Sequence, residues 1–396
     1  MNHDFSLNDM NTHVPAPRKI PGNTPMMDAE MQELMPGRIF GGKYRLEKLA
    51  GAGGMGIVWK AWDTVGERMV ALKFVPAEIR HLDDAMTRVK RTFKRIQVLN
   101  HTHICPVYGL EKDTEVGFYV VMKWLEGKSL ATFIEEEKEE GKSKLENGQR
   151  ISILRDVAEA LDYAHARGVI HRDVKPSNIF LTFKTENKTE NARENETKIR
   201  TGTETGAGIR TESETEIKSE IEDIYLIDFG LASEILETMN QYSNREINTS
   251  GTRPYMPPEQ WQGKSQTAQT DQYALGVVAY ELFSGKRPFQ ISDVEMLRLA
   301  ILQDVPDSIP EVSQSVNLTI LRALAKNPAE RFPSCTDFVN ALTQMVSASA
   351  TASYSYTDTY PQGYYYPGYG TPGYGTQGYT QSGHTPQVGY TQSGYT

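Results

Sequence analysis

The sequence predicts an α+β fold of two lobes, in which a small β-rich lobe precedes a larger helical lobe. Alternating and β-branched residues indicate strands between Tyr44 and Val75 and again from Phe118 to Lys123. After Ser129 the pattern turns helical. The segment from Ile151 to Arg167 carries one face with a residue every four positions, at Ile153, Val157, Leu161 and His165.

Composition divides the 396 residues into one folded domain and three segments that we expect to be disordered. The folded domain spans residues 39–346. The disordered segments are the N-terminal residues 1–38, an insertion at 183–223 and a C-terminal tail at 347–396. The insertion is rich in Thr, Glu, Asn and Lys and has almost no apolar residue to bury, so folding would not repay its entropy cost.

Cysteine usage and the lack of targeting segments indicate a cytoplasmic protein. Cys105 and Cys335 are too few for a disulfide framework or a metal site. The first 38 residues lack a basic start followed by an apolar run, so we expect no signal peptide. The longest apolar run, from Ala274 to Tyr280, is too short to cross a membrane. A net charge of −9 argues against binding to nucleic acid.

A glycine-rich turn separates the first two expected strands. Gly51, Gly53 and Gly56 have the spacing G-x-G-x-x-G, and the missing Cβ atoms let backbone N–H groups approach phosphates. A dinucleotide-binding loop has similar spacing, but it opens a helix. Here strands are expected on both sides, at Tyr44–Leu49 and Ile57–Trp62. That arrangement favours a hairpin that covers a nucleotide.

The stretch from His171 to Asn178 gathers three different polar groups. It holds the carboxylate of Asp173, the ammonium of Lys175 and the amide of Asn178, with Pro176 restraining the backbone between them. Transfer of a phosphoryl group from ATP to a hydroxyl uses such a trio: the carboxylate accepts the proton and the amide oxygen binds magnesium.

These motifs make the chain resemble the protein kinase family. The stretch at 171–178 reads H-R-D-x-x-x-x-N, and Gly51–Val58 reads G-x-G-x-x-G-x-V. Val70–Lys73 and Asp228–Gly230 follow in the family's order, as the strand lysine and the D-F-G triplet. The sequence looks most like bacterial serine/threonine kinases of the eukaryotic, or Hanks, type. The resemblance implies that the lobes have a protein-kinase-like arrangement.

The resemblance implies transfer of the ATP γ-phosphate, with Mg²⁺, to Ser or Thr hydroxyls of protein substrates. Asp173 would accept or orient the hydroxyl proton, Lys175 would steady the γ-phosphate, and Thr252 would support that pair. Asn178 and Asp228 would bind magnesium. The residues that would contact the nucleotide are Gly51, Gly53, Gly56, Val58, Ala71, Lys73, Met122, Lys123, Leu125 and Phe180.

Further family positions have structural roles. Asp271 would anchor the backbone of the H-R-D motif, and Glu259 would pair with Arg331. Phe229 would pack under the regulatory helix. Phosphorylation between Asp228 and Glu259 would control activity. The first expected acceptors are Thr249 and Ser250. Thr238 and Ser243 are the second choice.

The regulatory helix, expected at Asp83–Leu99, departs from the family. Counting back from His101 puts Thr92 where the family has a glutamate that pairs with Lys73. The helix is instead basic, with Arg88, Lys90, Arg91, Lys94 and Arg95. This leaves a second interpretation open, a pseudokinase scaffold with weak turnover.

The tail differs in kind from the insertion. Eleven of the 20 tyrosines fall between Tyr354 and Tyr395, spaced by Gly, Thr, Gln, Pro and Ser. Such tracts do not fold alone but can attract one another through aromatic contacts. A passive tether and self-association through the tail both remain open, as does a tail that is regulated by the kinase domain. The insertion is either a passive expansion or a docking loop. A separate hypothesis is that its threonines and serines are autophosphorylated.

Overall fold

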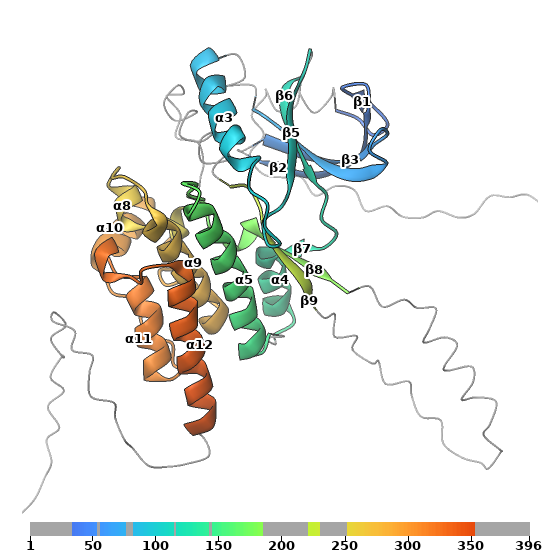
Figure 1. The fold of residues 1–396 in the computed structure, drawn as a ribbon. Helices are drawn as coiled ribbons and strands as arrows, with labels where there is room; N and C mark the ends of the chain where they lie inside the picture. The colour runs from blue at the N-terminus through green and yellow to red at the C-terminus, as the bar shows by residue number, and fades with distance from the viewer. Residues whose placement is uncertain are drawn as a thin grey trace, which may run out of the picture. The chain divides into compact units, whose positions relative to one another are not determined.

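The computed structural model describes residues 34–53, 56–76, 82–114, 116–141, 145–184, 221–229 and 252–352. They form a β-sheet with one helix beside it, a helical part, and a short sheet where the two meet (Figure 1). The three segments expected to be disordered lie mostly outside these residues. The expected phosphate acceptors lie wholly outside them: Thr238, Ser243, Thr249 and Ser250.

Within the described residues the first lobe contains a six-stranded antiparallel sheet with the order β1-β2-β3-β4-β6-β5. The register aligns Gly51 with Val58, Val58 with Lys73, and Lys73 with Val120, so that these residues form one row across four strands. The predicted strands are confirmed. They are β2 (Tyr44–Gly53), β3 (Gly56–Asp63), β4 (Arg68–Phe74) and β6 (Gly117–Lys123). The sheet also contains two strands that were not predicted, β1 (Ile39–Phe40) and β5 (Val107–Asp113).

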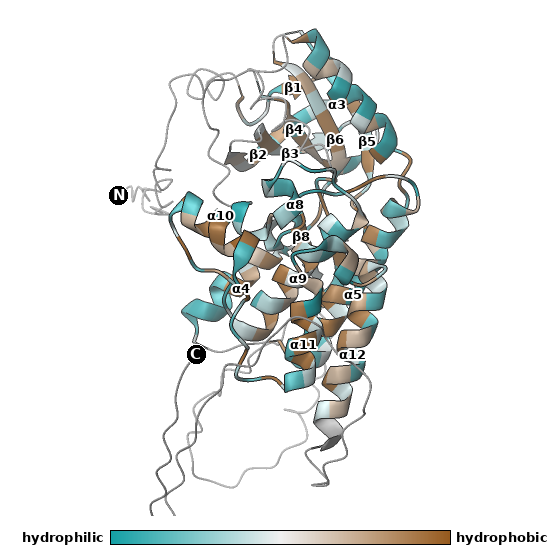
Figure 2. Cartoon of the chain, turned by 90° about the vertical axis from the view of Figure 1, so that its left-hand side faces the viewer, coloured by the Kyte–Doolittle hydropathy of each residue, from teal (hydrophilic) through white to brown (hydrophobic). Residues whose placement is uncertain are grey.

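The helix beside this sheet is α3 (Asp83–Ile96). Asp83 in its first turn and Arg95 in its last turn carry the charges that the helix dipole favours. The helix ends before the predicted Leu99, whose N–H instead closes a turn on the Ile96 carbonyl at 2.9 Å. Its buried face is apolar, and its other residues are mainly polar, which explains the teal colour over much of α3 in Figure 2.

The second lobe is helical, and its central helix is buried on every side. Every residue of α9 from Thr270 to Phe283 is buried, which includes the apolar run 274–280. Gly276 allows a close approach to the helix that ends at Ala323, because a Cβ at position 276 would lie 3.0 Å from the Cβ of Ala323. The helices are α4 (Leu130–Glu139), α5 (Asn147–His165), α8 (Pro258–Trp261), α9 (Ala268–Ser284), α10 (Val294–Gln303), α11 (Gln314–Ala323) and α12 (Cys335–Ala352).

A short sheet connects the two lobes. It consists of β7 (Lys128–Ser129), β8 (Ile179–Phe183) and β9 (Ile221–Leu226). Leu226 joins it to the loop after α3, because its N–H donates to His103 and its carbonyl accepts from Cys105, at 2.8 and 3.0 Å. The residues expected to carry the chemistry follow β9 or precede β8, so they lie at this junction.

The boundaries predicted for the insertion and the tail also differ from the structure. Phe183 pairs with Ile221 across β8 and β9, so the edges of the insertion at 183–184 and 221–223 continue the hairpin strands or adjoin them. α12 runs to Ala352 and takes up the first residues of the segment assigned to the tail. In both places backbone hydrogen bonds extend an element past the point where composition changes.

No helix among the described residues combines the length and the apolar character needed to span a bilayer.

Candidate active site

Four buried polar side chains meet at the start of the β8 hairpin. Lys175 Nζ lies 2.9 Å from Asp173 Oδ2, and Asn178 Nδ2 donates to the same oxygen at 2.9 Å. Lys175 also donates to Thr252 Oγ1 at 2.7 Å, which brings this threonine, 77 positions further along the chain, to the cluster. Asp173 Oδ1 is buried and accepts no hydrogen bond. The carboxylate is therefore held through one oxygen, and the other is open to a donor from a ligand.

The backbone that presents Asp173 is held in an uncommon conformation. Arg172 has a φ of +67°, in the left-handed region that non-glycine residues seldom adopt. Asp271 stabilises it by accepting the N–H groups of His171 and Arg172, each at 2.7 Å. The predicted anchoring role of Asp271 is confirmed. His171 Nδ1 accepts the Asp173 N–H at 3.2 Å, so Nε2 is left to donate to the Ile227 carbonyl at 2.9 Å.

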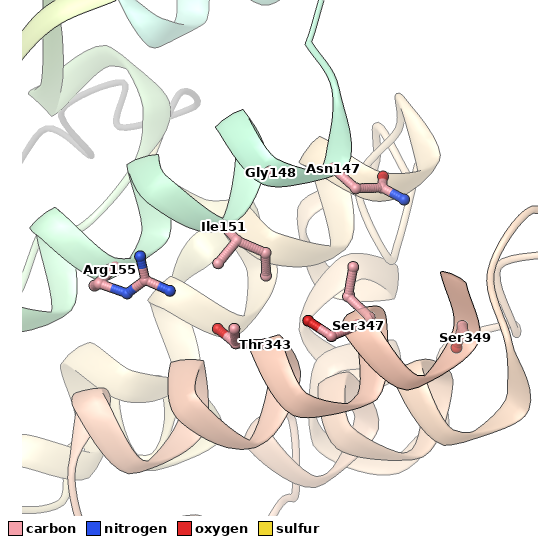
Figure 3. Close-up of a pocket in the computed structure, with 8 residues that line it drawn as sticks. Asn147, Gly148, Ile151, Arg155, Thr343, Ser347 and Ser349 are labelled. Atoms are coloured by element: carbon pink, nitrogen blue, oxygen red, sulfur yellow. The ribbon is translucent and has the colours of Figure 1, made fainter. Parts of the chain in front are cut away.

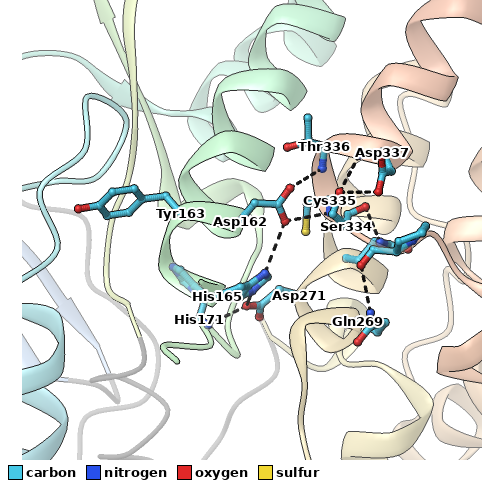
Figure 4. A network of polar contacts seen from close by, with 12 residues as sticks. Asp162, Tyr163, His165, His171, Gln269, Asp271, Ser334, Cys335, Thr336 and Asp337 are labelled. Carbon is cyan, nitrogen blue, oxygen red and sulfur yellow. Dashed lines mark hydrogen bonds and ion pairs between the residues drawn. The ribbon is translucent and has the colours of Figure 1, made fainter. Parts of the chain in front are cut away.

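A largely buried histidine, His165, connects this anchor to two other helices (Figure 4). His165 on α5 lies between Asp271, 2.7 Å from Nε2, and Asp162, 3.6 Å from Nδ1. Burial opposes its charge, but the two carboxylates together raise its pKa to about 9. Asp162 in turn accepts the N–H groups of Cys335 and Thr336 at the start of α12. The network therefore ties α5, α9 and α12 to the backbone of His171 and Arg172, next to Asp173.

Asp162, His165 and Cys335 also have ligand atoms within 4.8 Å of one another. The two oxygens of Asp162 are already taken by backbone donors, and burial holds the pKa of the Cys335 thiol well above its ordinary value. A metal needs the thiolate, so the arrangement is better explained as a helix cap than as a metal site.

Lys73 on β4 reaches across the cleft to the D-F-G aspartate. Its Nζ lies 2.7 Å from Asp228 Oδ2, and both side chains are largely buried. Burial opposes ionisation of Asp228, but the neighbouring Lys73 keeps its pKa below the ordinary value. Asp228 has a φ of +64°, a second left-handed residue at the site. Thr92 lies on α3, half-buried, as the residue count placed it.

The glycine turn lies at the end of the β2–β3 hairpin. Gly53 pairs with Gly56, and Gly51 pairs with Val58. Gly56 has a φ of +113°, and a Cβ there would overlap the Phe74 carbonyl oxygen. Only glycine fits this position without strain, so the turn can lie flat against the β4 strand that carries Lys73.

The predicted adenine contacts gather behind the turn. Ala71 pairs with Met122 across β4 and β6. Met122 and Phe180 pack against a cluster that contains Leu125. The side chain of Lys123 does not join them, because its ammonium donates to the hydroxyl of Tyr225 at 3.0 Å. Lys123 could therefore meet a nucleotide only through its backbone.

A small apolar cavity lies between α3 and the D-F-G segment. Phe93 and Ile96 of α3 line it together with Met122, Asp228 and Phe229. Phe229 also contacts the His171 ring, with the ring centroids 4.6 Å apart. The prediction that Phe229 packs under this helix is confirmed.

Oxygen atoms at the site fit a magnesium ion. Asn178 uses its Nδ2 on Asp173, which leaves its Oδ1 as a ligand atom, and Asp228 contributes a carboxylate. Both are the hard oxygen donors that Mg²⁺ prefers. Asn178 Oδ1 and the Asp228 carboxylate are therefore the groups that could hold the predicted ion.

Sequence reasoning missed two contacts around the cleft. Glu126 Oε1 accepts from both Lys60 and Trp124, each at 2.7 Å, and so connects β3 to the segment between the lobes. His103 binds the Ile224 carbonyl at 3.0 Å and lies 3.8 Å from Asp156. Apart from Trp124 and Glu126, which are two positions apart, these partners are far apart in the chain, and no local pattern marks them.

A groove of about 560 Å³ lies between α5 and α12 (Figure 3). Ile151 and Arg155 line one wall, and Thr343, Val346 and Ser347 line the other. None of the predicted site residues borders it, so the predicted chemistry does not involve this groove.

Comparisons with known proteins agree with this geometry. The chain matches the family described as "Protein kinase domain" over residues 44–345. It is 31% identical over 300 residues to serine/threonine-protein kinase PknE of Mycobacterium tuberculosis, covering 75% of this chain and 45% of PknE. It is 27% identical over 308 residues to serine/threonine-protein kinase PrkC of Bacillus subtilis, covering 77% and 40%. The chain thus spans less than half the length of these curated relatives.

A solved structure gives the same picture. The crystal structure of the M. tuberculosis PknI kinase domain superposes with a TM-score of 0.57 at 26% identity. The match covers 79% of this chain and 99% of that one. The two-lobed arrangement expected from the sequence is confirmed.

Proposed function

Because this chain belongs to the protein kinase family, we propose that it is a serine/threonine protein kinase that transfers the γ-phosphate of ATP to hydroxyl groups of proteins. One observation carries the proposal. Asp173 is fixed through Oδ2 by Lys175 and Asn178, while its Oδ1 is buried without a partner. A fixed carboxylate with one open oxygen is suited to accept a proton from an incoming hydroxyl.

The residues around Asp173 would bind the phosphates and the metal ion. Lys175, held by Thr252, is placed to neutralise charge on the transferred phosphate while keeping its contact with Asp173. Lys73 would hold the α- and β-phosphates, as its place in line with Val58 and Gly51 suggests. Asn178 and Asp228 would hold Mg²⁺, which when bound neutralises the phosphate oxygens.

The nucleotide itself would lie between the glycine turn and the apolar residues behind it. Gly51, Gly53 and Gly56 would cover the phosphates with backbone N–H groups. Apolar side chains would enclose the adenine, and backbone groups at 123 and 125 would bind its edge. The apolar side chains are Val58, Ala71, Met122, Leu125 and Phe180.

The proposal is tested with radiolabelled ATP and a generic protein substrate. Asp173→Asn should abolish phosphate transfer and leave the fold intact, because the amide cannot accept the proton. Asp293→Asn is the matched control. Asp293 caps α10 by accepting the Met296 N–H at 2.9 Å, and asparagine caps helices equally well. Full activity in Asp173→Asn would refute the assigned role.

Autophosphorylation belongs to the same proposal. Mapping phosphate by mass spectrometry after incubation with ATP should find it on Ser or Thr. The acceptors expected from the sequence are Thr249 and Ser250. If no phosphate is found on this chain while a second protein is phosphorylated, the enzyme acts only on other molecules and does not phosphorylate itself.

A scaffold that binds ATP with little turnover is the second candidate. It is favoured by one observation, the presence of Thr92 on α3 in place of a carboxylate. The same radiolabel assay distinguishes the two: nucleotide binding without transfer in the wild-type chain would support the scaffold.

A further inference from the structure

Three side chains connect β3 to the segment between the lobes. Glu126 Oε1 accepts a hydrogen bond from Lys60 Nζ and another from Trp124 Nε1, each at 2.7 Å. The Lys60 ammonium also lies 5.0 Å from the centre of the Trp124 ring. The ammonium is therefore held by both a carboxylate and an aromatic face, two favourable partners for a cation. We call Lys60, Trp124 and Glu126 the latch.

One end of the latch belongs to the strand that carries a proposed adenine contact. Val58 lies two positions before Lys60 on β3, so both side chains point to the same face of the sheet. Across the sheet Lys60 aligns with Ala71, and Ala71 aligns with Met122. Lys60 therefore lies beside the row of residues proposed to enclose the adenine. A movement of the β2–β3 hairpin would displace Lys60 and Val58 together.

The other end of the latch is fixed to the short sheet of β7, β8 and β9. Gly127, next to Glu126, packs so closely on β8 that a Cβ there would overlap the Leu181 carbonyl oxygen. The Lys123 ammonium donates to the hydroxyl of Tyr225 on β9 at 3.0 Å and lies 4.7 Å from the centre of its ring. The backbone is thus held on both sides of Glu126, and its carboxylate is a fixed point for the lysine on β3.

The exposure of the latch indicates what it can affect. The side chain of Lys60 is 22% exposed and that of Glu126 is 75% exposed. The hydrogen bond from Lys60 holds the pKa of Glu126 below its ordinary value, so this carboxylate is charged at neutral pH. An ion pair this open to solvent contributes little to the stability of a fold. Its effect is expected in the position of the hairpin relative to the segment between the lobes.

We infer that Lys60 and Glu126 are positioning residues for the nucleotide, and that their contact strengthens binding of its adenosine part. The inference rests on the proposed function. With the latch closed, Val58 and the backbone groups at 123 and 125 are already in place before the ligand arrives. Less conformational freedom is then lost on binding, which raises affinity. Neither hydrogen bond of the latch involves a residue proposed for phosphate transfer, so the transfer step does not depend on it.

Calorimetry with adenosine tests this without turnover and without phosphate charges. In the full chain, Lys60→Met keeps an unbranched side chain near the Trp124 ring but removes the charge. The dissociation constant of adenosine should rise about fivefold, the upper end for an exposed ion pair. Lys48→Met is the matched control, because Lys48 is an exposed lysine and the register partner of Lys60 on β2. An unchanged constant in Lys60→Met, or an equal rise in both variants, would overturn the inference.

Salt provides a second measurement. Adenosine is uncharged, so salt should weaken its binding to the wild type mainly by screening the Lys60–Glu126 pair, between about 0.05 M and about 0.5 M salt. Lys60→Met has no such pair, and its affinity for adenosine should stay constant over this range. The same salt dependence in the two proteins would contradict the inference.

Kinetics and a charge reversal complete the test. With ATP, Lys60→Met should raise KM by the factor found for adenosine and keep the wild-type kcat. Lys60→Glu combined with Glu126→Lys should bind adenosine more tightly than either single variant, because the reversed pair is again attractive. A fall in kcat, or no recovery in the double variant, would refute the latch. If neither adenosine nor ATP binds the wild type, the proposed function fails as well. Binding that Lys60→Met leaves unchanged refutes the inference alone.

Discussion

The guanidinium of Arg331 forms two hydrogen bonds, each 2.8 Å long, with the carboxylate of Glu259. Both residues are buried, and Arg331 also donates to the carbonyls of Ala325 and Gln269. The pair fastens α8, at the end of the activation segment, to the turn before α12. Its partners lie 72 positions apart in the sequence, yet the family resemblance predicted the contact.

Arg331→Met should destabilise the protein by about 3–5 kcal/mol, because it leaves the buried Glu259 carboxylate without its cation. Urea unfolding measures the change. Arg298→Met is the control, since Arg298 pairs with Glu295 on an exposed face of α10 at 3.1 Å. That change should cost no more than about 1 kcal/mol. If the two variants lose the same free energy of unfolding, the buried pair stabilises the protein no more than the exposed pair does.

The stability of the protein should depend on the charge of His165. Its folded pKa of about 9 lies above the ordinary 6.5. Protonation therefore stabilises the fold fully below pH 6.5, and this contribution disappears as the pH rises through 9. We expect a loss of about 3 kcal/mol across this range. His165→Gln should remove this alkaline slope from the free energy of unfolding, and an unchanged slope would assign it to other groups.

Asp162 should act at the opposite end of the pH scale. Burial opposes its charge, but His165 and the N–H groups at the start of α12 lower its pKa from 3.8 to about 2. The stabilisation is therefore present above pH 3.8 and is lost as the pH falls through 2. Asp162→Asn should flatten the acid limb of the stability curve, measured by thermal unfolding. An acid limb like that of the wild type would count against this network.

Two glycines of the turn should respond differently to alanine. Gly56→Ala should destabilise the protein by about 1–3 kcal/mol, because it strains a φ of +113° and brings Cβ onto the Phe74 carbonyl. Gly51→Ala should change stability by no more than about 0.5 kcal/mol, since nothing lies within 4 Å of the new Cβ. Thermal melts of the two variants give the comparison. Equal melting temperatures would mean that the loop relaxes freely.

Thr252 should support catalysis through Lys175. Thr252→Ala removes the hydroxyl that accepts the Lys175 hydrogen bond at 2.7 Å. A hydrogen bond to a charged group contributes about 1.5–3 kcal/mol, so kcat should fall by about tenfold or more. Thr252→Ser keeps the hydroxyl and should retain most of the activity. Loss of kcat in both variants would assign the effect to the methyl group or to packing.

Local patterns predicted much of this protein. The β2–β3 hairpin and α5 appear where turn residues and periodicity placed them, because these patterns reflect which face of a strand or helix is buried. Asp173, Lys175 and Asn178 also converge as expected. They are neighbours in sequence, so one loop suffices to bring them together.

Contacts between distant segments were harder to predict. The His165–Asp271 contact joins residues 106 positions apart, and the sequence around each residue does not indicate its partner. The same holds for Lys60 and Glu126, whose pairing depends on how the segment between the lobes passes β3. Such pairs follow from the packing of whole elements.

The amino-acid order alone determined which chemical groups this protein possesses and the elements that carry them, including the absence of an acid at Thr92. The tertiary structure decided which group Lys73 uses instead, Asp228, located 155 residues away. The physical reason is that a buried ammonium takes the nearest available carboxylate in space, and spatial distance between remote residues is set by how the lobes pack.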